Sequence, residues 1–451
     1  MPAAAARRVP PSKPRKETND RKRGRGGANA AHQHTLEHRL LLTATLCLLA
    51  VGAVMVYSAS SATTLLQGQG NAGSYLIKYL AYGAVGLLLM RLLARDGVAK
   101  VQAITAPLLV ASFVLVLAVH LPGLGVSVNG ARRWLGRGTF LFQPSELMKL
   151  ALVLYAATLL ARRPQKVNDL RELANPLLYV VAGACLLVVT QPDLGTAMVI
   201  AFTIVALLVA AGIPMGKLGV LGAFTIGAVF LYALVKPYAR ARLTSFIDPW
   251  AHASGSGFQA VQGQIAIGSG GLFGAGPGQS VQKIFYLPEA PTDFILAVIA
   301  EELGAVGVCA LMFLYGLIGY AGLRAAKNAK SLYSALIAVG VTSLILSQAL
   351  LNTFAVLGLA PLTGVPLPFV SYGSSSLIVM LAGMGLLLNV ASGGSAHVRA
   401  VAGPRRRSAD ARAREPARWD GERSAEQDRD RRGRDRRARR AGARGGRALE
   451  G

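Results

Sequence analysis

The sequence predicts an all-α polytopic membrane protein, a bundle of about ten transmembrane helices with a large extracytoplasmic loop between the seventh and the eighth. Hydrophobic residues make up 53% of the 451 residues, and only 16% are charged. A soluble domain carries about 25% charged residues. The apolar runs between the charged ends reach roughly 18 residues or more, enough to cross ~30 Å of hydrocarbon as helices. They lack strand alternation, which argues against an outer-membrane barrel.

The charges divide the chain into three regions. Residues 1–39 and 396–451 are rich in arginine and are expected to be disordered, basic cytoplasmic tails, and residues 40–395 form the transmembrane domain. The tails either are solvated segments or dock on anionic lipid headgroups or a cytosolic partner. The expected spans are 40–62, 75–93, 101–121, 144–161, 176–191, 194–212, 218–236, 292–322, 333–355 and 372–392.

The basic residues of the short loops predict the orientation, because cytoplasmic loops are enriched in Lys and Arg. With the N-terminus inside, the basic loops are internal, and an even number of spans returns the Arg-rich C-terminus to the cytoplasm. The net charge of +26 is therefore assigned to topology rather than to nucleic-acid binding. The first span is expected to act as its own insertion signal. The three cysteines fall in apolar runs, so no disulfide framework or zinc site is expected.

Two segments predicted to be external carry cations against this bias. They are 122–143 and 237–291, with Arg132, Arg133, Arg137, Arg240, Arg242 and Lys283. A few external cations can simply be tolerated. The functional interpretation is an anionic ligand at the outer surface, and Arg suits phosphate because its planar fork donates two parallel hydrogen bonds.

Polar residues also mark the starts of two predicted spans. In the segment from Phe142 through Pro144 to Lys149, Glu146 and Lys149 have i, i+3 spacing and can pair on one helix face, either as a simple helix-end ion pair or facing a polar cavity. Asp193 stands at another helix start, where capping by Asp is ordinary.

A further acidic motif precedes the eighth span. Pro291 is expected to open this helix and to place Asp293 in its first turn, where the helix dipole keeps the carboxylate ionised and able to accept a proton. The alternative is a plain acidic helix start. Glycines between 268 and 278 can let backbone N–H groups approach phosphate, although no P-loop spacing is present. The segment 361–376, which includes Ser371, is a turn at the mouth of the bundle.

These segments together resemble the SEDS family of shape, elongation, division and sporulation proteins, which includes FtsW, RodA and SpoVE. The motifs occur in order across roughly 40–395: NGARRW, FQPSE, PDLGT, FIDPW, GSGGLFG, LPEAPTDFI and PLTGVPLPFVSYGSSS. The stretch 278–289 is more similar to FtsW or SpoVE than to RodA, which favours the division type, FtsW. Members often have His where this chain has Pro291, and two glycines where it has Gly373-Ser374.

The resemblance implies an inverting glycosyltransferase, a lipid II polymerase that extends glycan strands of peptidoglycan on the outer face of the cytoplasmic membrane, at the division septum. Asp293 is the residue carried over as essential. The external arginines and Lys283 are then candidate diphosphate partners. The full candidate substrate-binding set is Arg132, Arg133, Trp134, Gln143, Ser145, Glu146, Lys149, Asp193, Lys283, Glu289 and Ser371.

The expected partners are lipid II, a class B penicillin-binding transpeptidase, other membrane proteins of the divisome and membrane lipid, but no nucleic acid. No cofactor is implied, and no metal-ligand spacing is present, although clustered outer carboxylates could bind a divalent cation. A lipid II flippase is the alternative function, but it predicts charges along a path through the membrane rather than at one face. A structural scaffold explains the tails and leaves Asp293 without a role.

Overall fold

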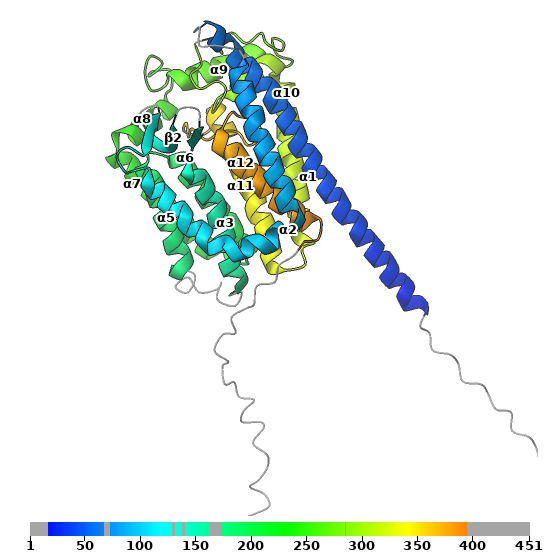
Figure 1. The fold of residues 1–451 in the computed structure, drawn as a ribbon. Coiled ribbons are helices and arrows are strands. Elements are labelled where there is room, and N and C mark those ends of the chain that lie inside the picture. Colours follow the sequence, from blue (N-terminus) through cyan, green and yellow to red (C-terminus); the bar gives the residue numbers. More distant parts are fainter. Residues whose placement is uncertain are drawn as a thin grey trace, which may run out of the picture. The chain divides into compact units, whose positions relative to one another are not determined.

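The computed structural model describes residues 17–66, 73–128, 131–137, 140–162, 174–284 and 286–394. Within them the chain is mainly helical (Figure 1). The elements are α1 (Glu17–Leu66), α2 (Ser74–Ala118), β1 (Gly125–Val128), β2 (Ala131–Arg137), β3 (Phe140–Phe142), α3 (Pro144–Arg162), the π-helical turn η2 (Ala174–Leu178), α5 (Tyr179–Thr190), α6 (Leu194–Ala210), α7 (Met215–Val235), α8 (Pro237–Ile247), α9 (Phe258–Gly270), α10 (Ile295–Lys327), α11 (Leu332–Val356) and α12 (Ser374–Ala391).

Seven described helices are long and apolar enough to cross a membrane by length and composition. One of them, α2, has non-helical backbone angles at Asp96, and its two arms match the second and third expected spans. The shorter apolar helices Pro176–Thr190 and Leu194–Ala210 match the fifth and sixth. The polytopic helical fold is therefore confirmed, and the number of crossings stays a prediction.

The core lies around α3 and α12, which contact α2 and α11. The apolar stretches of α12 and α3 are largely buried, at 89% and 83% of their residues, whereas the described side chains of α7 are mostly exposed. Polar side chains on α3, α11 and α12 therefore face protein, where they need partners. Helix α1 packs along α10 on one side of this core (Figure 1).

The predicted helical bundle is confirmed, and it also carries one small sheet that the sequence analysis did not expect. Strands β1, β2 and β3 form an antiparallel sheet in that order, with Val128 paired to Ala131 and Leu135 paired to Phe142. The physical reason is visible in the sequence. In the sequence, Asn129-Gly130 stands between the two paired strands, and an Asn-Gly pair is a strong signal for a two-residue hairpin. The sheet lies at the same end of the bundle as α8 and α9, called the sheet end below (Figure 1).

The N-terminal boundary also differs from expectation. Helix α1 spans Glu17–Leu66 and so begins within the tail expected at 1–39, whose disorder stays a prediction. Extending an existing helix needs no new nucleation, and this segment contains Ala, Glu, Lys and Arg, which favour helix. Residues 1–16 and the C-terminal tail expected at 396–451 lie outside the described residues.

Helix α10 is broken near its start. Gly304 has φ 68° and ψ −168°, which separates a short arm, 295–303, from a long arm, 305–327. The long arm alone measures roughly 35 Å at 1.5 Å per residue, enough to cross the hydrocarbon core. The excess length expected for the eighth span is therefore a separate short arm that follows Asp293.

Candidate active site

Asp293 lies at the sheet end, two residues before α10. Its carbonyl accepts a hydrogen bond of 2.7 Å from Asn352 Nδ2, which also donates to the carbonyl of Val365 at 2.8 Å. Gly364 faces the carboxylate, because a Cβ on this glycine would lie 3.4 Å from Asp293 Oδ2. The amide of Tyr372 donates to the carbonyl of Pro291 at 2.9 Å. Helix α11 and the 361–373 loop thus fix the Asp293 backbone.

Asp293 is half-buried, and the surroundings of its carboxylate disfavour the ionised form. Its pKa is raised to about 7, first by burial and then by the charge of Glu289, with a smaller rise from Asp193, while Arg133 and Arg242 lower it. The expectation that a helix start keeps Asp293 fully ionised was wrong, because α10 begins only at Ile295, and desolvation outweighs the dipole. Within the described chain, neither carboxylate oxygen accepts a hydrogen bond. Asp293 is therefore available to accept a proton.

Arg133 connects the sheet to the start of α6. Its Nε donates to the carbonyl of Gln191 at 3.0 Å, another nitrogen donates to the carbonyl of Pro192, and Nη1 lies 3.8 Å from Asp193 Oδ1. The register shifts at Arg133, because Val126 pairs with Trp134 and the next residue, Ser127, pairs with Arg132. Arg132 is exposed and Trp134 is half-buried. Of these three predicted residues, only Arg133 is among the groups that shift the pKa of Asp293.

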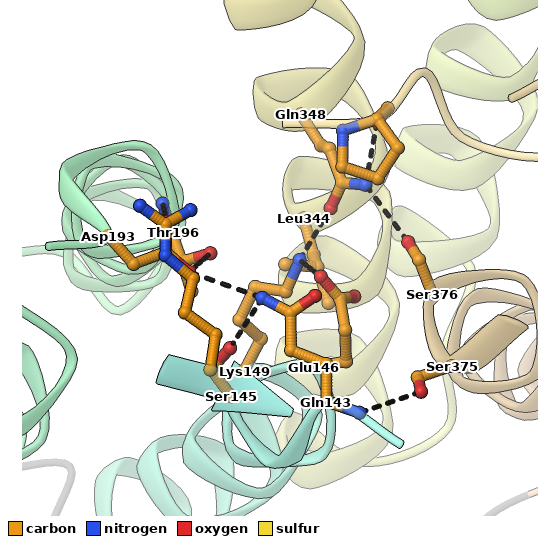
Figure 2. Close-up of polar contacts among 12 residues, drawn as sticks. Gln143, Ser145, Glu146, Lys149, Asp193, Thr196, Leu344, Gln348, Ser375 and Ser376 are labelled. Carbon is orange, nitrogen blue, oxygen red and sulfur yellow. Dashed lines mark hydrogen bonds and ion pairs between the residues drawn. The ribbon is translucent and has the colours of Figure 1, made fainter. Parts of the chain in front are cut away.

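Asp193 is the N-cap of α6 and the centre of a polar cluster (Figure 2). Its carboxylate accepts from the amide of Thr196 at 3.1 Å and from the hydroxyl of Thr196 at 2.9 Å. Gln143 donates through Nε2 to Asp193 at 3.2 Å and to Ser145 at 3.1 Å. The amide of Gln143 donates to the hydroxyl of Ser375 at 2.8 Å. Capping explains part of the role of Asp193, and the cluster also orients Arg133.

Glu146 and Lys149 form a buried ion pair of 2.8 Å on α3, as their spacing predicted. Lys149 also donates to Gln348 Oε1 at 2.7 Å, as Figure 2 shows. Gln348 Nε2 in turn donates to the carbonyl of Pro366 at 2.9 Å and to Ser376 at 3.2 Å. The second oxygen of Glu146, Oε2, is buried and has no hydrogen-bond partner among the residues that the structure describes. The pair therefore links α3 and α11 to the loop that faces Asp293.

Three other predicted residues have different roles. Lys283 is buried in a separate cluster with Glu302, at 2.7 Å. Ser371 accepts from the amide of Leu367 at 2.8 Å and closes a turn. Glu289 is exposed, has φ 57°, and accepts a hydrogen bond of 2.7 Å from Thr292. Glu289 acts on Asp293 by charge, whereas Lys283 is not among the groups that shift the pKa of Asp293.

The glycine-rich segment 268–278 does not present its amides to a ligand as expected. The amides of Ala275 and Gly276 donate to the carbonyls of Glu301 and Glu302, at 2.9 and 3.1 Å. A Cβ on Gly274 would collide with the main chain at Glu302. The glycines are needed because two stretches of main chain pack directly together.

Helix α11 supplies two site residues that the sequence analysis missed, Gln348 and Asn352. They are spaced i, i+4 inside an apolar helix, and polar residues on one face of a membrane helix are the signal that could have found them. Arg242 had been noted only as an external cation, and it donates to the carbonyl of Leu362 at 2.7 Å. Across the described residues, no group of three or more His, Cys, Asp or Glu side chains could hold a metal ion. The possible divalent cation therefore has no support in this part of the chain.

Comparison with known proteins identifies similar chains over the same region. The model of the FtsW, RodA and SpoVE cell cycle protein family matches residues 38–395. Stage V sporulation protein E of Bacillus subtilis is 39% identical over 351 residues, which cover 78% of this chain and 96% of that protein. A probable peptidoglycan glycosyltransferase FtsW of Coxiella burnetii is 42% identical over 357 residues, with 78% and 95% covered.

Two solved structures are also similar. One is a chain from a structure on the coordination of polymerization and crosslinking by a peptidoglycan synthase complex, with a TM-score of 0.64, 31% identity and 78% and 96% of the two chains covered. The other is the rod shape determining protein RodA of Thermus thermophilus, with a TM-score of 0.57, 30% identity and 78% and 95% covered.

Proposed function

The chain belongs to the FtsW, RodA and SpoVE family of cell cycle proteins, and from this premise we propose that it is a peptidoglycan glycosyltransferase that polymerises lipid II on the outer face of the cytoplasmic membrane. The observation that carries the proposal is the Asp293 carboxylate, which has a pKa raised to about 7 and lies within the electrostatic reach of Arg133 and Arg242. Relatives named peptidoglycan glycosyltransferase support the same reaction.

The proposed reaction forms one bond and breaks one. The 4-hydroxyl of an acceptor GlcNAc attacks the anomeric carbon of MurNAc in the growing strand, and the bond from that carbon to the lipid diphosphate breaks with inversion. The hydroxyl proton passes to Asp293. A base with a pKa near the working pH combines a substantial ionised fraction with proton affinity, and general-base catalysis contributes typically ~10²–10⁴ in rate.

The two arginines would stabilise the charge of the departing diphosphate. Arg133 is held by main-chain carbonyls and by Asp193, so its guanidinium is oriented before substrate arrives. Arg242 is fixed by the carbonyl of Leu362, next to the loop that faces Asp293. Arg132 and Lys283, the other cations predicted for this role, are not assigned to it.

The experiment is reconstitution of the purified chain with lipid II, with glycan strands and lipid movement scored separately. The wild-type protein is expected to make strands. Asp293→Asn keeps the size and removes the basicity, so we expect it to bind lipid II and lose ~10²-fold or more of polymerisation. Near-normal polymerisation by this variant would remove the general-base role and make Glu289 the next candidate. Lipid movement without strands would favour the flippase.

The proposed orientation places both termini in the cytoplasm and the sheet end outside. Gln279 and Lys327 are both exposed. Gln279 precedes the long arm of α10 in the sequence, and Lys327 is the last residue of that arm. In a chain whose native cysteines are replaced by alanine, Gln279→Cys should react with an impermeant thiol reagent in spheroplasts, and Lys327→Cys should not. Reversed labelling would place Asp293 on the cytoplasmic side.

A single-span class B transpeptidase is the proposed membrane partner, with a location at the division septum. The similar chain from a peptidoglycan synthase complex supports such a partner. A side chain added at Gly316 on α10 would meet open space, which leaves room for a partner helix, whereas Gly304 is covered by Leu272 and Gly274. Photocrosslinkers near Gly316 that never capture a transpeptidase would count against this surface.

A further inference from the structure

The short arm of α10 joins the Asp293 site to a second buried polar cluster. This cluster consists of Ser58 on α1, Lys283 in the loop before α10, and Glu302 at the far end of the short arm, with Lys283 and Glu302 only 3% and 1% exposed. Lys283 Nζ donates to Glu302 Oε1 at 2.7 Å, to the carbonyl of Gly278 at 2.8 Å and to Ser58 Oγ at 3.0 Å. These bonds use all three protons of the ammonium group.

Ser58 completes the cluster from a different helix. Its hydroxyl donates to both oxygens of Glu302, at 2.6 and 2.9 Å, while it accepts from Lys283. The neighbouring Glu301 accepts from Ser280 and, at 2.9 Å, from the amide of Val281. The side chains of Glu301 and Glu302 therefore tie the end of the short arm to α1 and to the 278–283 loop, in addition to the main-chain hydrogen bonds that Ala275 and Gly276 donate to it.

Because of the break at Gly304, the direction of the short arm is not fixed by the direction of the long arm. The helical hydrogen-bond ladder is interrupted there, and the 271–276 loop fills the gap. The amides of Ala305 and Val306 donate to the carbonyls of Gly271 and Leu272, at 3.0 and 3.2 Å. Because the long arm does not rigidly set the direction of the short arm, contacts at the two ends of the short arm must set it.

Those contacts are of two kinds. At the Asp293 end, Asn352 and Tyr372 hold main-chain carbonyls. At the opposite end, the Ser58–Lys283–Glu302 cluster holds a carboxylate. We infer that Ser58, Lys283 and Glu302 are positioning residues that fix the short arm of α10 and thereby the place of Asp293 relative to the bound sugars, an inference that rests on the proposed function.

Ser58 offers a test that spares the fold. Ser58→Ala removes one hydroxyl and leaves the Lys283–Glu302 charge pair intact. Displacement of a reacting group by about 1 Å can cost ~10²-fold in rate, so we expect kcat to fall about tenfold or more. The KM for lipid II should change by less than about twofold, because the missing contact touches no substrate. Ser58→Thr keeps the hydroxyl and should retain the wild-type kcat.

Ser112→Ala is the matched control. Ser112 is fully buried in α2, and its hydroxyl bonds to the carbonyl of Leu109 in the same helix, at 2.7 Å. This variant should keep the wild-type kcat, and all four proteins should have melting temperatures within a few degrees, as small polar changes cost about 1 kcal/mol.

Each outcome decides one point. A wild-type kcat in Ser58→Ala overturns the positioning role. A loss of kcat in Ser58→Ala that Ser58→Thr shares, or that tracks the melting temperature in every variant, also overturns it, because it then reflects packing. A wild-type protein that makes no glycan strands contradicts the proposed function instead. A fall in kcat confined to Ser58→Ala supports the inference.

Discussion

Asp293 and Glu302 flank the same short arm of α10, yet their surroundings are opposite. Glu302 accepts three hydrogen bonds and has a lysine as its counter-charge. Asp293 accepts none at its carboxylate within the described chain, and two other carboxylates raise its pKa. The comparison shows that an acidic residue in the sequence is not by itself a sign of a reactive carboxylate. A carboxylate with a counter-charge and several hydrogen-bond donors holds structure, and one left under-coordinated and desolvated is free for chemistry.

The largest expected effect separates these two carboxylates by stability. Glu302→Gln leaves the ammonium of Lys283 buried without a counter-charge, and loss of one partner of a buried pair costs ~3–5 kcal/mol. Asp293→Asn should not lower the melting temperature, because burial already disfavours the ionised form of Asp293. Thermal unfolding of the purified variants in detergent measures both effects.

The double variant Lys283→Met/Glu302→Gln is the control for this prediction. It removes both charges and should recover most of the stability, since neutral replacements of a buried pair are often tolerated. If Asp293→Asn and Glu302→Gln lose the same stability, the two carboxylates are not as different as the structure indicates.

The next effect concerns the two neighbouring arginines of β2. Arg133→Gln loses the contacts to Gln191, Pro192 and Asp193, and should lower polymerisation by ~10²-fold, as loss of an electrostatic donor at a reacting centre does. Arg132→Gln changes an exposed cation and should alter the rate by less than about twofold. Initial rates with lipid II compare them, and equal losses would mean that general basicity of the sheet is what matters.

A smaller effect is the pH dependence of the rate. The active form of Asp293 is the ionised one, so the rate should be full above about pH 7 and be lost as the pH falls through about 7. Arg242 lowers the pKa of Asp293, so Arg242→Gln should move this acidic limb to higher pH. Arg240→Gln, on the same helix, should leave the limb in place. A limb near pH 4 in the wild-type protein would contradict the desolvated site.

The opposite shift is expected at Glu289, the charge that affects the pKa of Asp293 most and raises it. Glu289→Gln should therefore move the acidic limb to lower pH. Because Glu289 is exposed, salt should screen its effect, so the difference from wild type should shrink at about 1 M ionic strength, where the Debye length is ~3 Å. A difference that salt leaves unchanged would indicate a direct contact in place of a charge effect.

The fold was largely predictable because long apolar runs encode membrane helices directly. The motif containing Asp293 and the Glu146–Lys149 spacing were also readable, since each lies within a few residues of sequence. The roles of Arg242, Gln348 and Asn352 were not, because they come from contacts between helices far apart in the chain. Lys283 shows the opposite error. A cation in a loop predicted to be external was assigned to the ligand, although Glu302 on the short arm of α10 neutralises it.

The junction between the 271–276 loop and α10 has a consequence for inhibitors. Its hydrogen bonds run between main-chain atoms, and a side chain added at Gly274 or Gly304 would collide with the opposite backbone. A compound that competes for these main-chain groups would bind atoms that no codon change can remove. Leu272 and Phe273, 61% and 78% exposed beside the junction, offer apolar surface for such a compound. A resistance mutation within this contact would have to leave Gly274 and Gly304 unchanged, so few such substitutions are available.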